Sequence, residues 1–122
     1  MIISFEYLQP SQLYICSEKL EAVQREFRQA SHLALYWTYP IIKINNRHVL
    51  TDRHTHALVA FNQGVKLAIA YLDEDDLDLN AYQVCVSWCL GEGVKEIGDL
   101  NARVLPYSEY QEKWIKRCQA IR

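Results

Sequence analysis

Five consecutive residues, Asp52, Arg53, His54, Thr55 and His56, are the part of this sequence best equipped for chemistry. They fall where the pattern predicts the start of a helix, whose first N–H groups are free and whose dipole is positive. Cationic side chains are disfavoured there, yet an arginine and two histidines occupy the position. Free N–H groups, a hydroxyl and cationic donors together would bind a phosphate or another anion. The alternative is that Asp52 caps the helix while the basic groups point into solvent.

The neighbouring residues predict a strand, a tight turn, a second strand and then the helix. The predicted hairpin spans residues 41–50, with Asn45–Asn46 as its turn, because asparagine tolerates a positive φ. Either Thr51 or Asp52 is the predicted N-cap of the helix. The helix is expected to end at Gly64, where a left-handed residue commonly terminates the last turn.

The rest of the chain alternates between strand and helix patterns. The patterns predict strands at 2–7 and 65–71 and helices at 18–29, 81–89 and 108–121, the last of which opens with a Ser108–Gln111 capping box. We therefore predict an α/β (α+β) fold, with a small mixed sheet and flanking helices. The whole chain, 1–122, would form a single domain, in which residues 1–71 make the core and residues 72–122 a helical extension.

The composition narrows the classes of protein to which the chain can belong. It has 122 residues, half of them apolar, and a net charge of −2. This length is typical of one domain, and the charge predicts no basic surface, so a nucleic-acid partner is not expected. No apolar run reaches the roughly 18 residues that a membrane span needs, and the first residues do not resemble a secretory signal. We expect a cytoplasmic protein without a membrane partner.

Three further groups of residues have both a chemical and an ordinary explanation. The acidic run at 73–78 would hold Mg²⁺ beside a phosphate, or would form a solvated loop whose last aspartate caps the next helix. His48, His54 and His56 would share a metal only at a loop-like helix start, because histidines two apart do not share a helical face. We therefore assign no metal site. The four cysteines contain no CxxC pair and are interpreted as buried small side chains, with no pattern that supports a redox role.

The segment 50–61 resembles the box of the ParB N-terminal/sulfiredoxin-like superfamily. Members place a short strand before a D-G-H-x-R or G-E-R-R-type box, which opens an alanine-rich helix. Gly64 and the apolar strand at 65–71 fit the same pattern. The resemblance covers residues 2–71, and the second half looks similar to an extension of small stand-alone bacterial ParB-like proteins. It implies a mixed sheet with flanking helices and a nucleotide phosphate bound at the box.

Two positions of the box depart from the family pattern. Asp52 matches the acidic opening, His54 the box histidine and Thr55 the variable position, but Arg53 replaces a glycine and His56 replaces an arginine. Glycine allows a phosphate to approach the backbone closely, which a side chain at Arg53 would hinder. At position 56, histidine replaces the permanently charged guanidinium of the box arginine with an imidazole that titrates near neutral pH.

The resemblance also implies ligands and roles. ATP, ADP or CTP would bind through Arg53, His54, Thr55 and His56, with Mg²⁺ as a further expected cofactor. Phosphoryl transfer to a small molecule would use Asp52 and His54 as catalytic residues. The alternative is a non-catalytic module that associates with protein or DNA and has a degenerate nucleotide box, as Arg53 and His56 would indicate. A homodimer is a further expectation, since aromatic residues of the extension would pack an interface as well as a core.

Overall fold

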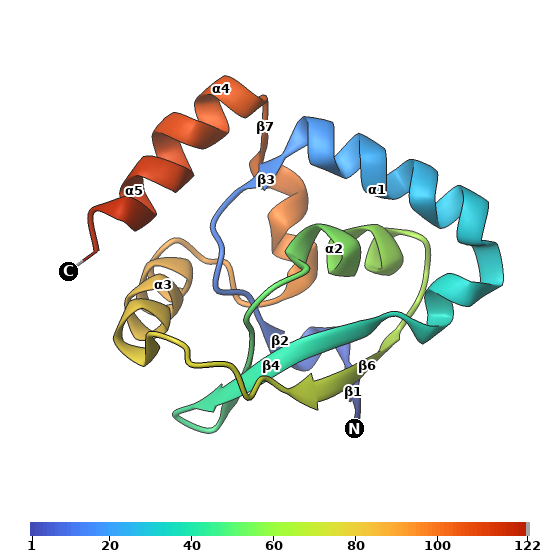
Figure 1. Cartoon of the computed structure of the whole chain (residues 1–122), viewed down its shortest axis with the longest axis horizontal. Coiled ribbons are helices and arrows are strands. Elements are labelled where there is room, and N and C mark those ends of the chain that lie inside the picture. Colours follow the sequence, from blue (N-terminus) through green and yellow to red (C-terminus); the bar gives the residue numbers. More distant parts are fainter. Residues whose placement is uncertain (122) are drawn as a thin grey trace.

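The computed structural model describes residues 1–121, and Arg122 lies outside the described part of the chain. Within residues 1–121, five strands form a mixed sheet in the order β1-β6-β4-β5-β2, and helices surround it (Figure 1). The β1–β6 and β4–β5 pairs are antiparallel, whereas the β4–β6 and β2–β5 pairs are parallel. The small mixed sheet with flanking helices predicted from the sequence is therefore confirmed.

The elements are as follows. The strands of the sheet are β1 (Ile2–Ser4), β2 (Leu8–Gln9), β4 (Thr38–Ile44), β5 (Arg47–Leu50) and β6 (Leu67–Leu72), and a separate parallel pair joins β3 (Ile15–Cys16) to β7 (Val104–Leu105). The α-helices are α1 (Ser17–Ala30), α2 (His54–Asn62), α3 (Leu79–Gly91), α4 (Tyr107–Tyr110) and α5 (Lys116–Gln119). The 3-10 helices are Phe5–Tyr7, Ser31–Tyr36 and Ile97–Arg103, and the π-turn Gln111–Ile115 joins α4 to α5. None of the helices described in residues 1–121 combines the length and the apolar character that crossing a membrane requires.

The hairpin that leads to α2 forms as predicted. Asn45 and Asn46 have φ values of 50° and 64°, which is the left-handed conformation that a two-residue hairpin turn requires. Ile44 and Arg47 are directly paired across the turn. This register carries β5 straight into the loop before α2, so the hairpin determines where that helix begins.

The alternation of side chains along β4 divides the apolar residues between two clusters. Ile41 is fully buried in the main core with Leu58 of α2. Ile42 points the other way, as successive strand residues do, and belongs to a smaller cluster with Val86 of α3. Helix α2 therefore packs on one face of the sheet, and α3 covers part of the other.

The C-terminal half packs into the same core as the first half. Leu100 lies in the 3-10 helix Ile97–Arg103, and Trp114 lies in the π-turn. Both belong to one apolar cluster with Phe5 and Leu58. The β3–β7 pair also joins the two halves, since Ile15 lies opposite Val104. Residues 72–121 therefore complete the core that α2 occupies.

Two details of the predicted elements are wrong. Residues 2–7 do not form one strand, because a 3-10 turn capped by Ser4 interrupts them and sends β2 to the far edge of the sheet. The Ser108–Gln111 capping box is not formed. The helix begins one residue earlier, after Pro106, so Ser108 lies inside the first turn, and the Gln111 side chain donates to the Tyr107 hydroxyl instead.

Candidate functional site

The N-terminus of α2 differs from the predicted start of this helix. Arg53, rather than Thr51 or Asp52, is the N-cap, because the Ala57 N–H donates to the Arg53 carbonyl at 2.9 Å. The Thr51 hydroxyl is engaged elsewhere, with the Asp73 carboxylate at 2.7 Å. The Asp52 carboxylate accepts the Arg53 N–H at 2.7 Å. Within residues 1–121, no side chain caps α2, and the first-turn N–H groups of a helix have no partner inside the helix.

The backbone of Arg53 is in the left-handed region, with φ 66° and ψ 31°. For a residue with a Cβ atom this conformation costs about 1 kcal/mol or more, and glycine is the residue that usually adopts it. Asn45 and Asn46 share a positive φ, but asparagine tolerates it in a turn. Arg53 is thus a strained residue at the start of a helix, and such strain is concentrated at functional positions.

His54 is a buried, neutral hydrogen-bonding group. Its side chain lies at the surface of a cavity but the residue is only 4% exposed, and its Nε2 accepts the Ser11 N–H at 3.0 Å. The Ser11 hydroxyl in turn donates to the Leu50 carbonyl at 2.6 Å. Burial lowers the pKa of His54 to about 4, so the imidazole is neutral at pH 7 and carries its proton on Nδ1. A cationic role for His54 in holding phosphate is therefore not supported.

His56 lies on a different side of the helix from His54 and faces α1. Its Nε2 is 3.2 Å from Glu26 Oε2, and its ring packs edge-on against Trp37 at 5.1 Å between centroids. Burial and the charge of Arg53 lower the pKa of His56, against the opposing effect of Glu26. Glu26 lies thirty positions before His56, so no local spacing could have pointed to this pair.

Cationic groups gather beside this end of α2. Burial raises the pKa of Tyr39 to about 12 against the opposing charge of Arg53, and the same charge adds to burial in lowering the pKa of His56. The charge of Lys19 in α1 also contributes to lowering the pKa values of His54 and His56. In the described part of the chain, neither Arg53 Nε nor His56 Nδ1 finds a hydrogen-bond partner, although both atoms are buried. We call Lys19 and Arg53 the α2 cationic cluster.

The remaining predicted residues do not join this cluster. Thr55 is 3% exposed, which leaves little of its side chain available to a ligand. Asp52 is exposed and lines a separate hollow of about 370 Å³ with Asp73, Glu74 and Asp75. The structure thus separates the predicted five-residue site into an acidic side and a basic side. Among residues 1–121, no three His, Cys, Asp or Glu side chains are placed to hold a metal ion together.

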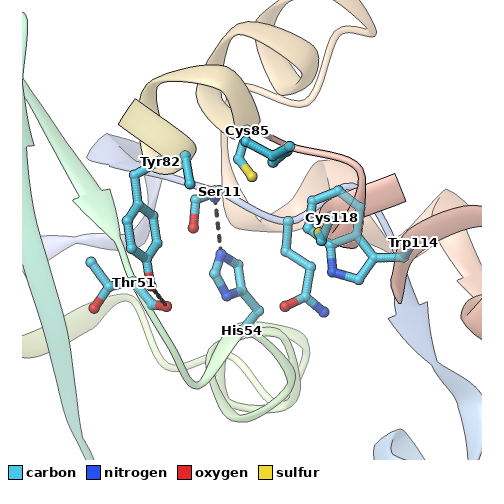
Figure 2. A pocket seen from close by; sticks show the side chains of 10 residues that line it. Ser11, Thr51, His54, Tyr82, Cys85, Trp114 and Cys118 are labelled. Atoms are coloured by element: carbon cyan, nitrogen blue, oxygen red, sulfur yellow. Dashed lines mark hydrogen bonds between the residues drawn. The ribbon is translucent and has the colours of Figure 1, made fainter. Parts of the chain in front are cut away.

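Besides the acidic and the basic side, a cavity adjoins the N-terminus of α2. It has a volume of about 290 Å³ and lies between α2, α3 and the C-terminal helix. Figure 2 shows His54 at its floor, below Ser11, Tyr82 and Cys85. The Tyr82 hydroxyl donates to the Thr51 carbonyl at 3.1 Å, which ties α3 to the loop before α2. Tyr82 and Ser11 were not identified from the sequence, because distant segments meet here only after folding.

Comparisons with known proteins identify the fold but not the function. No model of a protein family matches the chain, and no curated protein matches it. The crystal structure of the protein Atu1540 from Agrobacterium tumefaciens is similar, with a TM-score of 0.52 and 17% sequence identity. The match covers 78% of this chain and 48% of the other, so this chain spans about half the length of that protein. At this identity the similarity concerns the fold alone.

Proposed function

We propose that this chain binds a phosphate-bearing ligand, most suitably a nucleotide, at the N-terminus of α2. The observation that carries the proposal is the left-handed Arg53, which opens a helix that no side chain within residues 1–121 caps. Such a helix end presents N–H groups and a positive dipole to an anion. The α2 cationic cluster adds positive charge at the same place, and the buried Arg53 Nε has no hydrogen-bond partner within residues 1–121.

The left-handed backbone conformation of Arg53 is consistent with the resemblance to the ParB/sulfiredoxin-like box. The glycine of the D-G-H-x-R box corresponds to Arg53, and Arg53 adopts the conformation that glycine favours. This conformation supports the proposal that the backbone of the box is retained although the glycine is replaced. Arg53 would then supply the permanent positive charge that is lost where His56 replaces the box arginine.

Phosphoryl transfer from ATP, ADP or CTP to a small molecule is the reaction that we propose for an enzymatic form of this site. Asp52 would be the acidic group, as a base or as a ligand of Mg²⁺ beside the phosphates, since Mg²⁺ needs only one or two protein carboxylates there. Asp52 and Asp73 line one hollow, which supports this assignment. His54 would contribute as a neutral donor through Nδ1–H. A cytoplasmic location, where nucleotides are abundant, is part of the proposal.

A thermal-shift panel of ATP, ADP, CTP and GTP, each with and without Mg²⁺, tests the proposal. A nucleotide at 100 times its dissociation constant should stabilise the protein by about 2.7 kcal/mol. Arg53→Asn keeps a residue that tolerates the left-handed conformation but removes the charge, so the shift should disappear. Arg47→Asn is the matched control, because Arg47 is an exposed arginine on β5, and its shift should equal that of the wild type.

A non-catalytic interaction module is the second candidate. The 3-10 helix after α1 exposes Leu33, Leu35 and Tyr36 to solvent by half or more of their surface, which is typical of a surface that contacts a partner or a second copy. A flat panel at millimolar nucleotide, together with a dimer in sedimentation analysis that Leu35→Asp dissociates, would favour this candidate over nucleotide binding.

A further inference from the structure

Two cysteines from distant parts of the chain face each other in the cavity above His54. Cys85 comes from α3 and Cys118 from α5, and both line the same cavity of about 290 Å³. Figure 2 shows both side chains directed into this space. Both are free thiols. Since the cavity is open to solvent, small polar molecules can reach the pair.

The π-turn in the C-terminal helix places Cys118 at this cavity. The Lys116 N–H donates to the Gln111 carbonyl five residues earlier, so this turn holds one residue more than an α-helix would. Without that residue, Cys118 would be rotated by about 100° around the helix axis, away from Cys85. Trp114 fixes the turn, because it is buried and packs edge-on against Trp88 at 6.2 Å between centroids. Single π-turns inside α-helices occur frequently at functional sites.

The surroundings make the two thiols chemically different. The neighbouring Cys118 thiol lowers the pKa of Cys85, and the Cys85 thiol raises that of Cys118. The charge of Arg117 favours the Cys85 thiolate further. Cys89, one turn along the same helix, has its pKa raised to about 12 by burial. Cys85 is therefore the more nucleophilic of the two thiols on α3, and Cys118 lies next to it. Cys89, on the same helix, serves as an internal control for thiol reactivity.

We propose that Cys85 and Cys118 are a redox-active thiol pair that reduces a small hydroperoxide in this cavity and closes into an intramolecular disulfide. A space of about 290 Å³ has room for hydrogen peroxide or a short alkyl hydroperoxide beside the two thiols. In a reducing compartment, a disulfide of this kind serves catalysis or sensing rather than stability. The inference does not depend on nucleotide binding at α2.

The proposed reaction has two steps. The Cys85 thiolate attacks one peroxide oxygen, the O–O bond breaks, and the other oxygen takes a proton and leaves as water or an alcohol. Cys85 is then a sulfenic acid. The Cys118 sulfur attacks the Cys85 sulfur, the S–S bond forms, the S–O bond breaks, and hydroxide leaves as water with the Cys118 proton. Two electrons pass from the two thiols to the peroxide, and an external thiol restores the pair by exchange.

Mass spectrometry of the full chain after treatment with stoichiometric hydrogen peroxide tests the proposal. The expected result is the loss of two hydrogen atoms, a peptide that links Cys85 to Cys118, and reversal by dithiothreitol. Cys118→Ser should stop at the sulfenic acid, which dimedone traps on Cys85. Cys89→Ser is the matched control and should still form the disulfide.

A second measurement on the unmodified chain does not depend on how the variants fold. At pH 7, iodoacetamide should label Cys85 at least about tenfold faster than Cys89, because only the thiolate reacts. Equal labelling of the two, or oxidation that links a different pair of cysteines or produces only sulfinic and sulfonic acids, would overturn the proposal.

Discussion

Helix α3 begins with an aspartate that caps it, whereas helix α2 begins with an arginine in a left-handed conformation. The Asp78 carboxylate accepts the Ala81 N–H at 3.0 Å, as the sequence predicts for the end of the acidic loop. Arg53 offers no such bond within the described residues. The two helices also differ in burial, since six of the nine residues of α2 are buried but only three of the thirteen residues of α3. Packing against the core holds α2 in place although no side chain within residues 1–121 caps it.

The largest expected effect concerns His54, which fastens the start of α2 to the segment before α1. His54→Ala removes the acceptor of the buried Ser11 N–H and leaves a cavity, so we expect the free energy of unfolding to fall by about 3 kcal/mol. Urea denaturation measures this change. His32→Ala, at an exposed histidine, should change it by less than about 0.5 kcal/mol. Equal effects of the two substitutions would remove the structural role assigned to His54.

The second effect is on the pH dependence of stability. The pKa of His54 is about 4 in the folded protein and 6.5 in the unfolded chain, so between these values the unfolded chain binds more protons. Stability is therefore fully present above pH 6.5 and falls as the pH decreases towards 4. The loss between pH 7.5 and 4.5 should be about 2–3 kcal/mol larger in the wild type than in His54→Gln. Parallel pH profiles of the two proteins would show that His54 is not the buried titrating group.

A smaller effect tests the cap of α3. Asp78→Ala should lower the free energy of unfolding by about 1 kcal/mol, the usual value for an N-cap aspartate. Asp76→Ala is the matched control, because Asp76 is an exposed aspartate of the same acidic loop that does not cap α3, and it should change the free energy of unfolding by less than about 0.5 kcal/mol. If both aspartates had the same effect, general charge in the loop would explain it, and the contrast between the two helix starts would be lost.

The smallest effect has the opposite sign. Arg53→Gly relieves a left-handed backbone that costs about 1–2 kcal/mol, but glycine adds about 0.5–1 kcal/mol of entropy to the unfolded chain. The net result should be a gain in stability of less than about 1 kcal/mol. Arg47→Gly, in strand β5, should instead destabilise the protein by about 0.5–1 kcal/mol. Thermal denaturation of the pair distinguishes the two signs, and a loss at both positions would contradict strain at Arg53.

Local patterns predicted the elements well. The Asn45–Asn46 turn, the helix expected at 18–29 and the strand expected at 65–71 all appear within a few residues of their predicted bounds. These features depend on neighbours in the chain, namely turn chemistry and periodic apolar residues. The interruption of the strand after Ser4, which puts β1 (Ile2–Ser4) and β2 (Leu8–Gln9) at opposite edges of the sheet, depends on pairing with distant strands, which local patterns do not contain.

The site was predicted only in part, for the same reason. The irregular start of α2 was visible as basic residues in a position that disfavours them. Three contacts of this region join residues at least thirty positions apart. They are the hydrogen bond from Ser11 to His54, the contact of Glu26 with His56 and the proximity of Cys85 to Cys118. Only the tertiary fold and a π-turn bring them together.

Nuclear magnetic resonance of the ¹⁵N-labelled chain during titration with ATP and Mg²⁺ tests the central claim most directly, with the other nucleotides titrated in turn. The account predicts that the backbone amide signals of His54, Thr55 and His56 shift, because their N–H groups receive the phosphates. The amide of Ala81 at the capped start of α3 should stay unchanged. Shifts confined to other segments, or no shifts with any nucleotide at millimolar concentration, would contradict a phosphate site at the N-terminus of α2.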